Sequence, residues 1–128
     1  MEQQAVGERS AIVVVDDDHL VLKAMQRVLG KEFRVFPASG IGEAKDILDK
    51  QGDIRLIISD YRMGGGNSGV ELLEYAMRTR PAIGRILVSG SLLATHAQRA
   101  VETRVAHAYL PKPWDNRLLL ETVRKHCR

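Results

Sequence analysis

Short apolar runs alternate with segments in which apolar residues recur every three or four positions, along almost the whole chain. The short runs are rich in β-branched residues and predict five buried strands, at Ala11–Val15, Phe33–Phe36, Ile54–Ser59, Arg85–Val88 and Ala106–Leu110. The segments between them have the spacing of amphipathic helices, as Val21, Met25 and Val28 illustrate. This alternation predicts an α/β domain with a parallel sheet, because each right-handed crossover returns a helix to one face of the sheet.

The boundaries of the domain follow from the same pattern. Ser68 and Glu71 form a capping box that predicts the start of a helix. No internal repeat, low-complexity tract or linker divides the sequence. We therefore predict a single domain over residues 11–128, preceded by a polar, flexible lead-in over residues 1–10. The lead-in lacks the apolar core of a secretory signal, and no window is apolar enough to span a membrane.

Composition narrows the class of protein. Hydrophobic residues make up 45% and charged residues 27% of the 128 positions, as in ordinary globular domains. The single cysteine, Cys127, excludes an intramolecular disulfide and favours a reducing compartment, so we expect a cytoplasmic protein. The net charge is +3, but the arginines follow no recognition-helix pattern and no aromatic residues interleave with them. We expect neither direct nucleic-acid binding nor membrane association.

Polar residues follow four of the predicted strands. Asp16 and Asp17 come after the first strand and Asp60 after the third, while Ser89 and Lys112 come after the fourth and fifth. The carboxyl ends of parallel strands meet at one edge of the sheet, which is where ligands bind in such folds. Clustered carboxylates repel one another, so they persist mainly where a cation such as Mg²⁺ neutralises them. The pattern implies a metal ion and phosphate chemistry.

These motifs resemble those of the receiver domains of two-component response regulators. The matching segments are Val13–Asp18, Ile57–Met63, Ile86–Gly90 and Tyr109–Trp114. The resemblance extends from about Ala11 to Lys125 and depends on the order of the motifs as much as on each motif. It implies a doubly wound, flavodoxin-like (βα)5 fold, a three-layer sandwich whose five-stranded parallel sheet has the order 2-1-3-4-5.

The resemblance also implies an acceptor and a metal site. Asp60 would be the phosphorylated residue, its carboxylate attacking a phosphoryl group to form an aspartyl-phosphate. Asp17, Asp60 and the backbone carbonyl of Arg62 would bind Mg²⁺, for which Mn²⁺ could substitute, and Asp16 would bind mostly through water. The ion would offset the charge on the transferring phosphoryl oxygens.

Three further residues have roles in the family pattern. Ser89 would hydrogen-bond one phosphoryl oxygen, and Lys112 would pair with another. Ser89 and Tyr109 would form the switch, because the hydroxyl moves toward the phosphoryl group and the aromatic ring then turns inward. The Lys112–Pro113 peptide is expected to be cis, as it characteristically is in this family.

Partners follow from the same resemblance. The phosphoryl donor would be a sensor histidine kinase or a phosphotransfer protein. The domain would assist its own phosphorylation and dephosphorylation without turning over an external substrate, so it is not expected to be an enzyme in the usual sense. The fourth helix, fifth strand and fifth helix would form the output face, acting on an effector domain in a longer chain or on a second copy in a homodimer. Candidate residues of that face are Leu92, Leu93, Tyr109, Trp114, Arg117 and Leu118.

Two departures from the family pattern bear on the site. Residues 64–67 read Gly-Gly-Gly-Asn where a proline commonly follows the methionine, so we expect a loop that is mobile without its ion. Arg62 lies two positions after Asp60, where it cannot act as a base and could shield the phosphoryl group; we expect it to slow hydrolysis. His19 next to the acidic run is assigned no metal role, because no second nitrogen or sulfur ligand accompanies it.

Two other classes of function are compatible with parts of the pattern. A phosphohydrolase of the haloacid-dehalogenase type would use Asp16 as nucleophile and Asp18 as general acid/base. That interpretation leaves Asp60 without a role, and the chain lacks a cap insertion and a later acidic pair. A phosphate-independent interaction module is the third class, and the full set of acidic, hydroxyl and lysine residues weighs against it.

Overall fold

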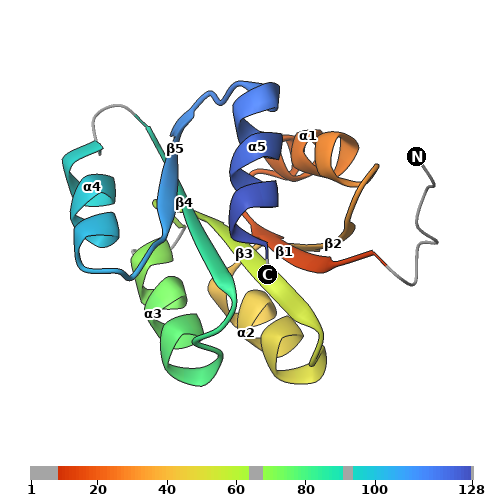
Figure 1. Cartoon of the computed structure of the whole chain (residues 1–128), viewed down its shortest axis with the longest axis horizontal. Helices are drawn as coiled ribbons and strands as arrows, with labels where there is room; N and C mark the ends of the chain where they lie inside the picture. Colours follow the sequence, from red (N-terminus) through yellow and green to blue (C-terminus); the bar gives the residue numbers. More distant parts are fainter. Residues whose placement is uncertain (1–8, 64–67, 91–93, 128) are drawn as a thin grey trace.

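The computed structural model describes residues 9–63, 68–90 and 94–127. Strands and helices alternate throughout this part of the chain (Figure 1). Their bounds are β1 (Ala11–Val15), α1 (His19–Leu29), β2 (Arg34–Ala38), α2 (Ile41–Lys50), β3 (Ile54–Asp60), α3 (Gly69–Thr79), β4 (Gly84–Gly90), α4 (Ala94–Glu102), β5 (Ala108–Lys112) and α5 (Asn116–His126).

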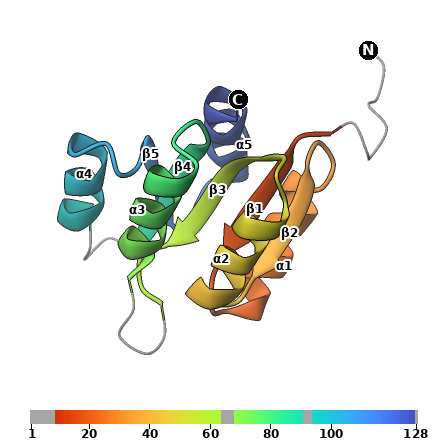
Figure 2. The same cartoon turned by 90° about the horizontal axis from the view of Figure 1, so that it is seen from below.

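The five strands form one parallel sheet with the order β2-β1-β3-β4-β5. Helices α1 and α5 cover one face, and α2, α3 and α4 cover the other (Figure 2). The predicted fold class, a flavodoxin-like three-layer (βα)5 sandwich, is confirmed. Successive strands are added on one side of β1 for β2 and on its other side from β3 onward. β1 and β3 therefore lie side by side, and their carboxyl ends open onto the same crevice.

Alternate residues of the strands fill two separate cores. On β1, Ile12 and Val14 face the layer of α1 and α5, whereas Val13 and Val15 face the layer of α2, α3 and α4. Every residue of β1 is buried, which explains why this strand reads as a continuous apolar run and does not alternate with polar residues. The rigid centre of the sheet is therefore the base from which the polar strand ends project.

The strand bounds differ from those predicted. β5 is displaced to Ala108–Lys112 from the predicted residues 106–110, and β2 is likewise displaced toward its carboxyl end. The observed strands include Pro37 and Pro111, which the apolar pattern did not cover; β2 and β5 are the two edge strands, where a residue without an N–H is tolerated. Main-chain pairing extends β4 to Gly90, and it brings Lys112 opposite that glycine.

A buried arginine joins two loops at the opposite end of the sheet. Arg85 is 4% exposed, and its guanidinium donates to the carbonyls of Pro81 and Ile83 before β4 and of Arg104 and Val105 before β5. Burial lowers the pKa of Arg85 from its ordinary value. These contacts stabilise the edge of the sheet away from the acidic residues.

Side chains cap the starts of α1 and α3. The Ser68 side chain accepts from the Val70 N–H at 3.0 Å, which confirms the predicted helix start, and Asp18 accepts from the Leu20 N–H at 2.9 Å. Within the described ranges, no helix combines the length and the apolar character that crossing a bilayer requires.

Candidate functional site

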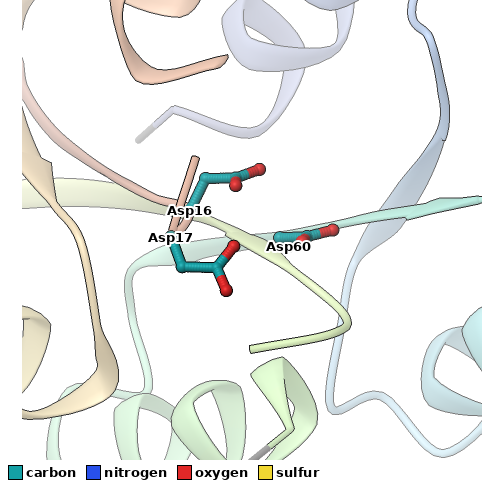
Figure 3. A group of neighbouring side chains, drawn as sticks. All are labelled: Asp16, Asp17 and Asp60. Atoms are coloured by element: carbon teal, nitrogen blue, oxygen red, sulfur yellow. The ribbon is translucent and has the colours of Figure 1, made fainter. Parts of the chain in front are cut away.

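Three carboxylates converge at the end of β1 and β3 (Figure 3). Asp16 and Asp17 directly follow β1, and Asp60 is the last residue of the neighbouring β3. Each offers a carboxylate oxygen, and the three oxygens lie within 4.8 Å of one another. The predicted convergence is confirmed. An all-oxygen donor set of this kind fits Mg²⁺ or Mn²⁺, which are hard cations, and could hold such an ion.

The Asp16 carboxylate is buried and hydrogen-bonded through both oxygens. It is 1% exposed; its Oδ1 accepts from the backbone N–H of Asp18 at 2.9 Å and its Oδ2 accepts from Nζ of Lys112 at 2.9 Å. Its own N–H donates to the Ala38 carbonyl at the end of β2. Asp16 therefore fixes the turn that leads from β1 into α1 and orients the lysine.

Lys112 reaches the carboxylates from the end of β5. Its Nζ lies 2.9 Å from Asp16 Oδ2 and 3.4 Å from Asp60 Oδ2. The Lys112–Pro113 peptide is cis, as expected from the sequence. Partial burial acts to lower the pKa of Lys112, but the hydrogen bond and charge of Asp16, with those of Asp60, outweigh it, so the pKa stands above its ordinary value. The ammonium is therefore a fixed positive charge at neutral pH.

Asp60, which completes the group, is only 7% exposed. Burial raises the pKa of Asp60, and the negative charge of Asp16 raises it further, while Lys112 acts in the opposite direction. A carboxylate with these neighbours gains from a cation, because the cation favours its ionised form. The ionised form is also the nucleophilic one.

A close backbone contact at Asp60 was not anticipated from the sequence. A Cβ on Gly69 would lie 2.0 Å from the backbone oxygen of Asp60 and 2.8 Å from Oγ of Ser59. Gly69 is the first residue of α3 and is buried, so α3 begins directly against the end of β3. The only signal in the sequence was a glycine immediately after a helix-capping serine, which by itself does not identify its neighbour.

Ser89 lies on the strand next to Asp60. Asp60 pairs with Val88 across β3 and β4, so Ser89 is one position farther toward the end of β4. The side chain is buried, and its Oγ donates to the Gly90 carbonyl at 3.1 Å. Tyr109 on β5 pairs with Leu87 and is 37% exposed. Ser89 and Tyr109, the predicted switch residues, therefore lie on β4 and β5, on the other side of β3 from β1.

The remaining predicted residues lie around this group. Arg62 is exposed and forms an isolated bridge with Ser68 across the loop. His19 is exposed at the start of α1, and the described residues include no group of possible metal ligands that contains it. The Asp18 side chain caps α1, which leaves it unsuited to the general acid/base role of the phosphohydrolase alternative. The glycine loop at 64–67 and the candidate output-face residues Leu92 and Leu93 lie outside the described residues.

Comparison with known proteins identifies the family. A family model of the response regulator receiver domain matches residues 12–124. The hydrogenase transcriptional regulatory protein HoxA of Cupriavidus necator is 34% identical over 118 residues, which is 92% of this chain and 24% of that protein. The chain thus spans about a quarter of the length of the curated relatives it matches.

Solved structures agree with this assignment. The CheY-like receiver domain protein of Methanospirillum hungatei JF-1 has a TM-score of 0.82 and 29% identity over 92% of this chain and 93% of that one. The signal receiver domain of an HD domain-containing protein from Pseudomonas fluorescens Pf-5 has a TM-score of 0.84 and 26% identity, over 93% and 94% of the two chains. The family match argues against the phosphohydrolase alternative, and the chain belongs to the response regulator receiver domain family, whose members are signalling domains of two-component systems.

Proposed function

We propose that this receiver accepts a phosphoryl group on Asp60, in a magnesium-dependent reaction, from the phosphohistidine of a sensor kinase or phosphotransfer protein. The observation that carries the proposal is the meeting of Asp16, Asp17 and Asp60 with Lys112 at one edge of the sheet. This arrangement combines a buried nucleophile, oxygen ligands for a cation and a fixed positive charge. These are the components that phosphoryl transfer to a carboxylate requires.

The transfer is a displacement at phosphorus. An oxygen of the Asp60 carboxylate forms a bond to phosphorus while the bond from phosphorus to the histidine nitrogen breaks, and the electron pair of that bond stays on the departing imidazole. Asp17, Asp60 and the backbone carbonyl of Arg62 would hold the magnesium ion, with Asp16 acting through water. When bound, the ion neutralises charge on the carboxylates and the phosphoryl oxygens.

Two side chains near Asp60 would change partners after transfer. Lys112 would exchange its contact with the Asp60 carboxylate for one with a phosphoryl oxygen, while Asp16 continues to orient it. The Ser89 hydroxyl, which donates to the Gly90 carbonyl, would turn to a second phosphoryl oxygen. Tyr109 would then move inward from its exposed place on β5, which changes the face formed by α4, β5 and α5.

Loss of the phosphoryl group would follow by attack of water, so the domain assists both its own phosphorylation and its own dephosphorylation. Arg62 is exposed beside the acceptor and would slow this hydrolysis by covering the phosphoryl group. The curated relatives are longer regulators, named as transcriptional regulators. By analogy, the α4-β5-α5 face would act on an effector domain of a longer chain, or on a second copy in a homodimer.

Labelling with acetyl phosphate tests the acceptor. The protein with Mg²⁺ and radiolabelled acetyl phosphate should acquire an acyl phosphate, and chelation with EDTA should prevent it. Asp60→Asn should abolish the label. The control Asp53→Asn changes an exposed carboxylate just before β3 begins, at the opposite end of that strand from Asp60, and should retain the label.

The outcomes separate the three classes of function. Label that survives Asp60→Asn but is lost in Asp16→Asn would support the phosphohydrolase chemistry. If the wild-type protein acquires no label and binds no Mg²⁺ in a direct titration, the domain would be a phosphate-independent interaction module. If Asp60 is labelled, a kinase pull-down followed by phosphotransfer in vitro would identify the natural donor.

A further inference from the structure

A side-chain contact joins the residue after Asp60 to α4. The hydroxyl of Tyr61 and Nδ1 of His96 lie 3.0 Å apart, within hydrogen-bond distance. The two rings also pack against each other, with centroids 5.6 Å apart. Tyr61 directly follows the proposed acceptor, whereas His96 lies in the first turn of α4, 35 residues away. The contact therefore connects the acceptor strand to one element of the proposed output face.

The backbone of Tyr61 leaves it little freedom to move independently of Asp60. Its N–H donates to the Val88 carbonyl at 2.7 Å, and its carbonyl accepts from the Gly69 N–H at 2.7 Å. These bonds tie the residue to β4 and to the start of α3. A shift of the backbone at the acceptor is consequently passed to the tyrosine ring.

Helix α4 is held to the sheet by little apolar surface. Among residues 95–102, the buried hydrophobic side chains are those of Ala97 and Ala100, whereas α1 buries Leu22, Met25 and Leu29. A pocket of about 370 Å³ also lies between α3 and α4, lined in part by the tyrosine and the histidine. Because the free energy of burial scales with apolar area, a polar contact contributes a larger share of the attachment of α4 than it would for α1. Figure 1 shows α4 at the outer side of β4 and β5, away from α1 and α5.

We propose that His96 is a positioning residue that, through Tyr61, holds α4 in the arrangement in which Asp60 is paired with Lys112. This role of His96 rests on the proposed function of Asp60 as the phosphoryl acceptor. A phosphoryl group adds a phosphorus and three oxygens to a carboxylate that is 7% exposed, so the backbone at this point must adjust. The tyrosine ring then leaves the histidine, and α4 is released.

This coupling has a reciprocal consequence. If phosphoryl binding weakens the tyrosine–histidine contact, the contact must weaken phosphoryl binding by the same factor. Removing the contact should therefore loosen α4 and, equally, tighten binding of a phosphoryl analogue. A contact that is only structural would loosen the helix without changing the affinity at Asp60.

Native-state hydrogen exchange of the whole chain measures the first effect. Tyr61→Phe and His96→Ala should each speed exchange of the α4 amides by about threefold, the effect expected from losing one exposed hydrogen bond. The double variant should show no further increase, because both changes remove the same contact. His96→Asn places an amide where Nδ1 lies and should restore protection. Tyr75→Phe is the matched control: it removes a hydroxyl that donates to Asp49 at 2.7 Å between α3 and α2, and it should leave α4 unchanged.

Titration with beryllofluoride and Mg²⁺ measures the second effect. His96→Ala and Tyr61→Phe should bind this phosphoryl analogue about threefold more tightly than the wild-type protein, and Tyr75→Phe should bind it equally. Unchanged α4 exchange would overturn the proposal, and so would faster exchange with an unchanged affinity. If the wild-type protein bound no beryllofluoride, the proposed function of Asp60 would fail together with the coupling. The other two outcomes would overturn the coupling alone, because the wild-type protein would still bind the analogue.

Discussion

Replacing Asp60 by asparagine should make the metal-free protein more stable, although the residue is the centre of the proposed site. The charge interactions of Asp60 nearly cancel. At an effective dielectric constant of about 20, an Asp16 oxygen within 4.8 Å costs at least about 3.5 kcal/mol, and the Lys112 ammonium at 3.4 Å contributes about 5 kcal/mol of attraction. Asp17 is exposed, so water reduces its repulsion to about 1 kcal/mol.

Burial then decides whether Asp60→Asn raises or lowers the free energy of unfolding. A carboxylate that is 7% exposed loses most of its hydration, which costs several kcal/mol, whereas a neutral amide of the same shape loses less. We therefore expect Asp60→Asn to raise the free energy of unfolding by about 1–3 kcal/mol at pH 7. The raised pKa of Asp60 agrees, because the folded protein binds the proton of this group more tightly than the unfolded chain. The wild-type protein therefore loses stability as the pH rises from the ordinary pKa of an aspartate through the raised pKa of Asp60 in the folded state. At acidic pH, where Asp60 is protonated in both states, the stability advantage of Asp60→Asn should vanish.

Urea unfolding in EDTA, followed by fluorescence of the single tryptophan, Trp114, measures this difference. Asp46→Asn is the control, since Asp46 is exposed on α2 and its replacement should change stability by less than about 0.5 kcal/mol. Added Mg²⁺ should stabilise the wild-type protein by about 1.4 kcal/mol at ten times its dissociation constant, and the variant much less. A variant less stable than the wild-type protein in EDTA would refute the reasoning.

Three further changes have definite expected outcomes. Arg85→Met removes the buried donors to four backbone carbonyls and should lower the free energy of unfolding by about 2–4 kcal/mol in urea, with Arg85→Lys recovering only part of it. Gly69→Ala should cost at least about 2 kcal/mol and reduce acetyl-phosphate labelling, because the added methyl group meets the Asp60 backbone; normal labelling would contradict this contact. Lys112→Met should destabilise the protein by about 3 kcal/mol at pH 7 by leaving buried carboxylates uncompensated. Because the pKa of Lys112 is raised, thermal unfolding should show this difference in full from about pH 7 to about pH 10.5, and it should narrow as pH rises through the folded-state pKa.

The acidic group could be predicted from the sequence because its position depends on a general rule. Parallel strands place their carboxyl ends at one edge, so residues that directly follow β1 and β3 must approach one another. The cis peptide after Lys112 followed from the family resemblance. The pairing of that lysine with Asp16 did not, because it depends on where the end of β5 lies relative to β1.

Other features had no local signal. The contact of Tyr61 with His96 joins residues 35 positions apart through side chains that periodicity does not link. The shift of β5 to Ala108–Lys112 arose because hydrogen-bond pairing with β4, and not the apolar pattern, defines the strand. The approach of α3 to Asp60 at Gly69 is likewise a tertiary contact.

The prolines of the two outer strands constrain how this domain associates with other chains. Pro37 on β2 and Pro111 on β5 leave neither margin of the sheet with an unbroken row of main-chain donors. A sixth strand from another molecule would lack a regular template on either side, which disfavours fibre-like stacking of many copies. Association through the side chains of the surrounding helices is favoured over pairing of main chains at the edges of the sheet.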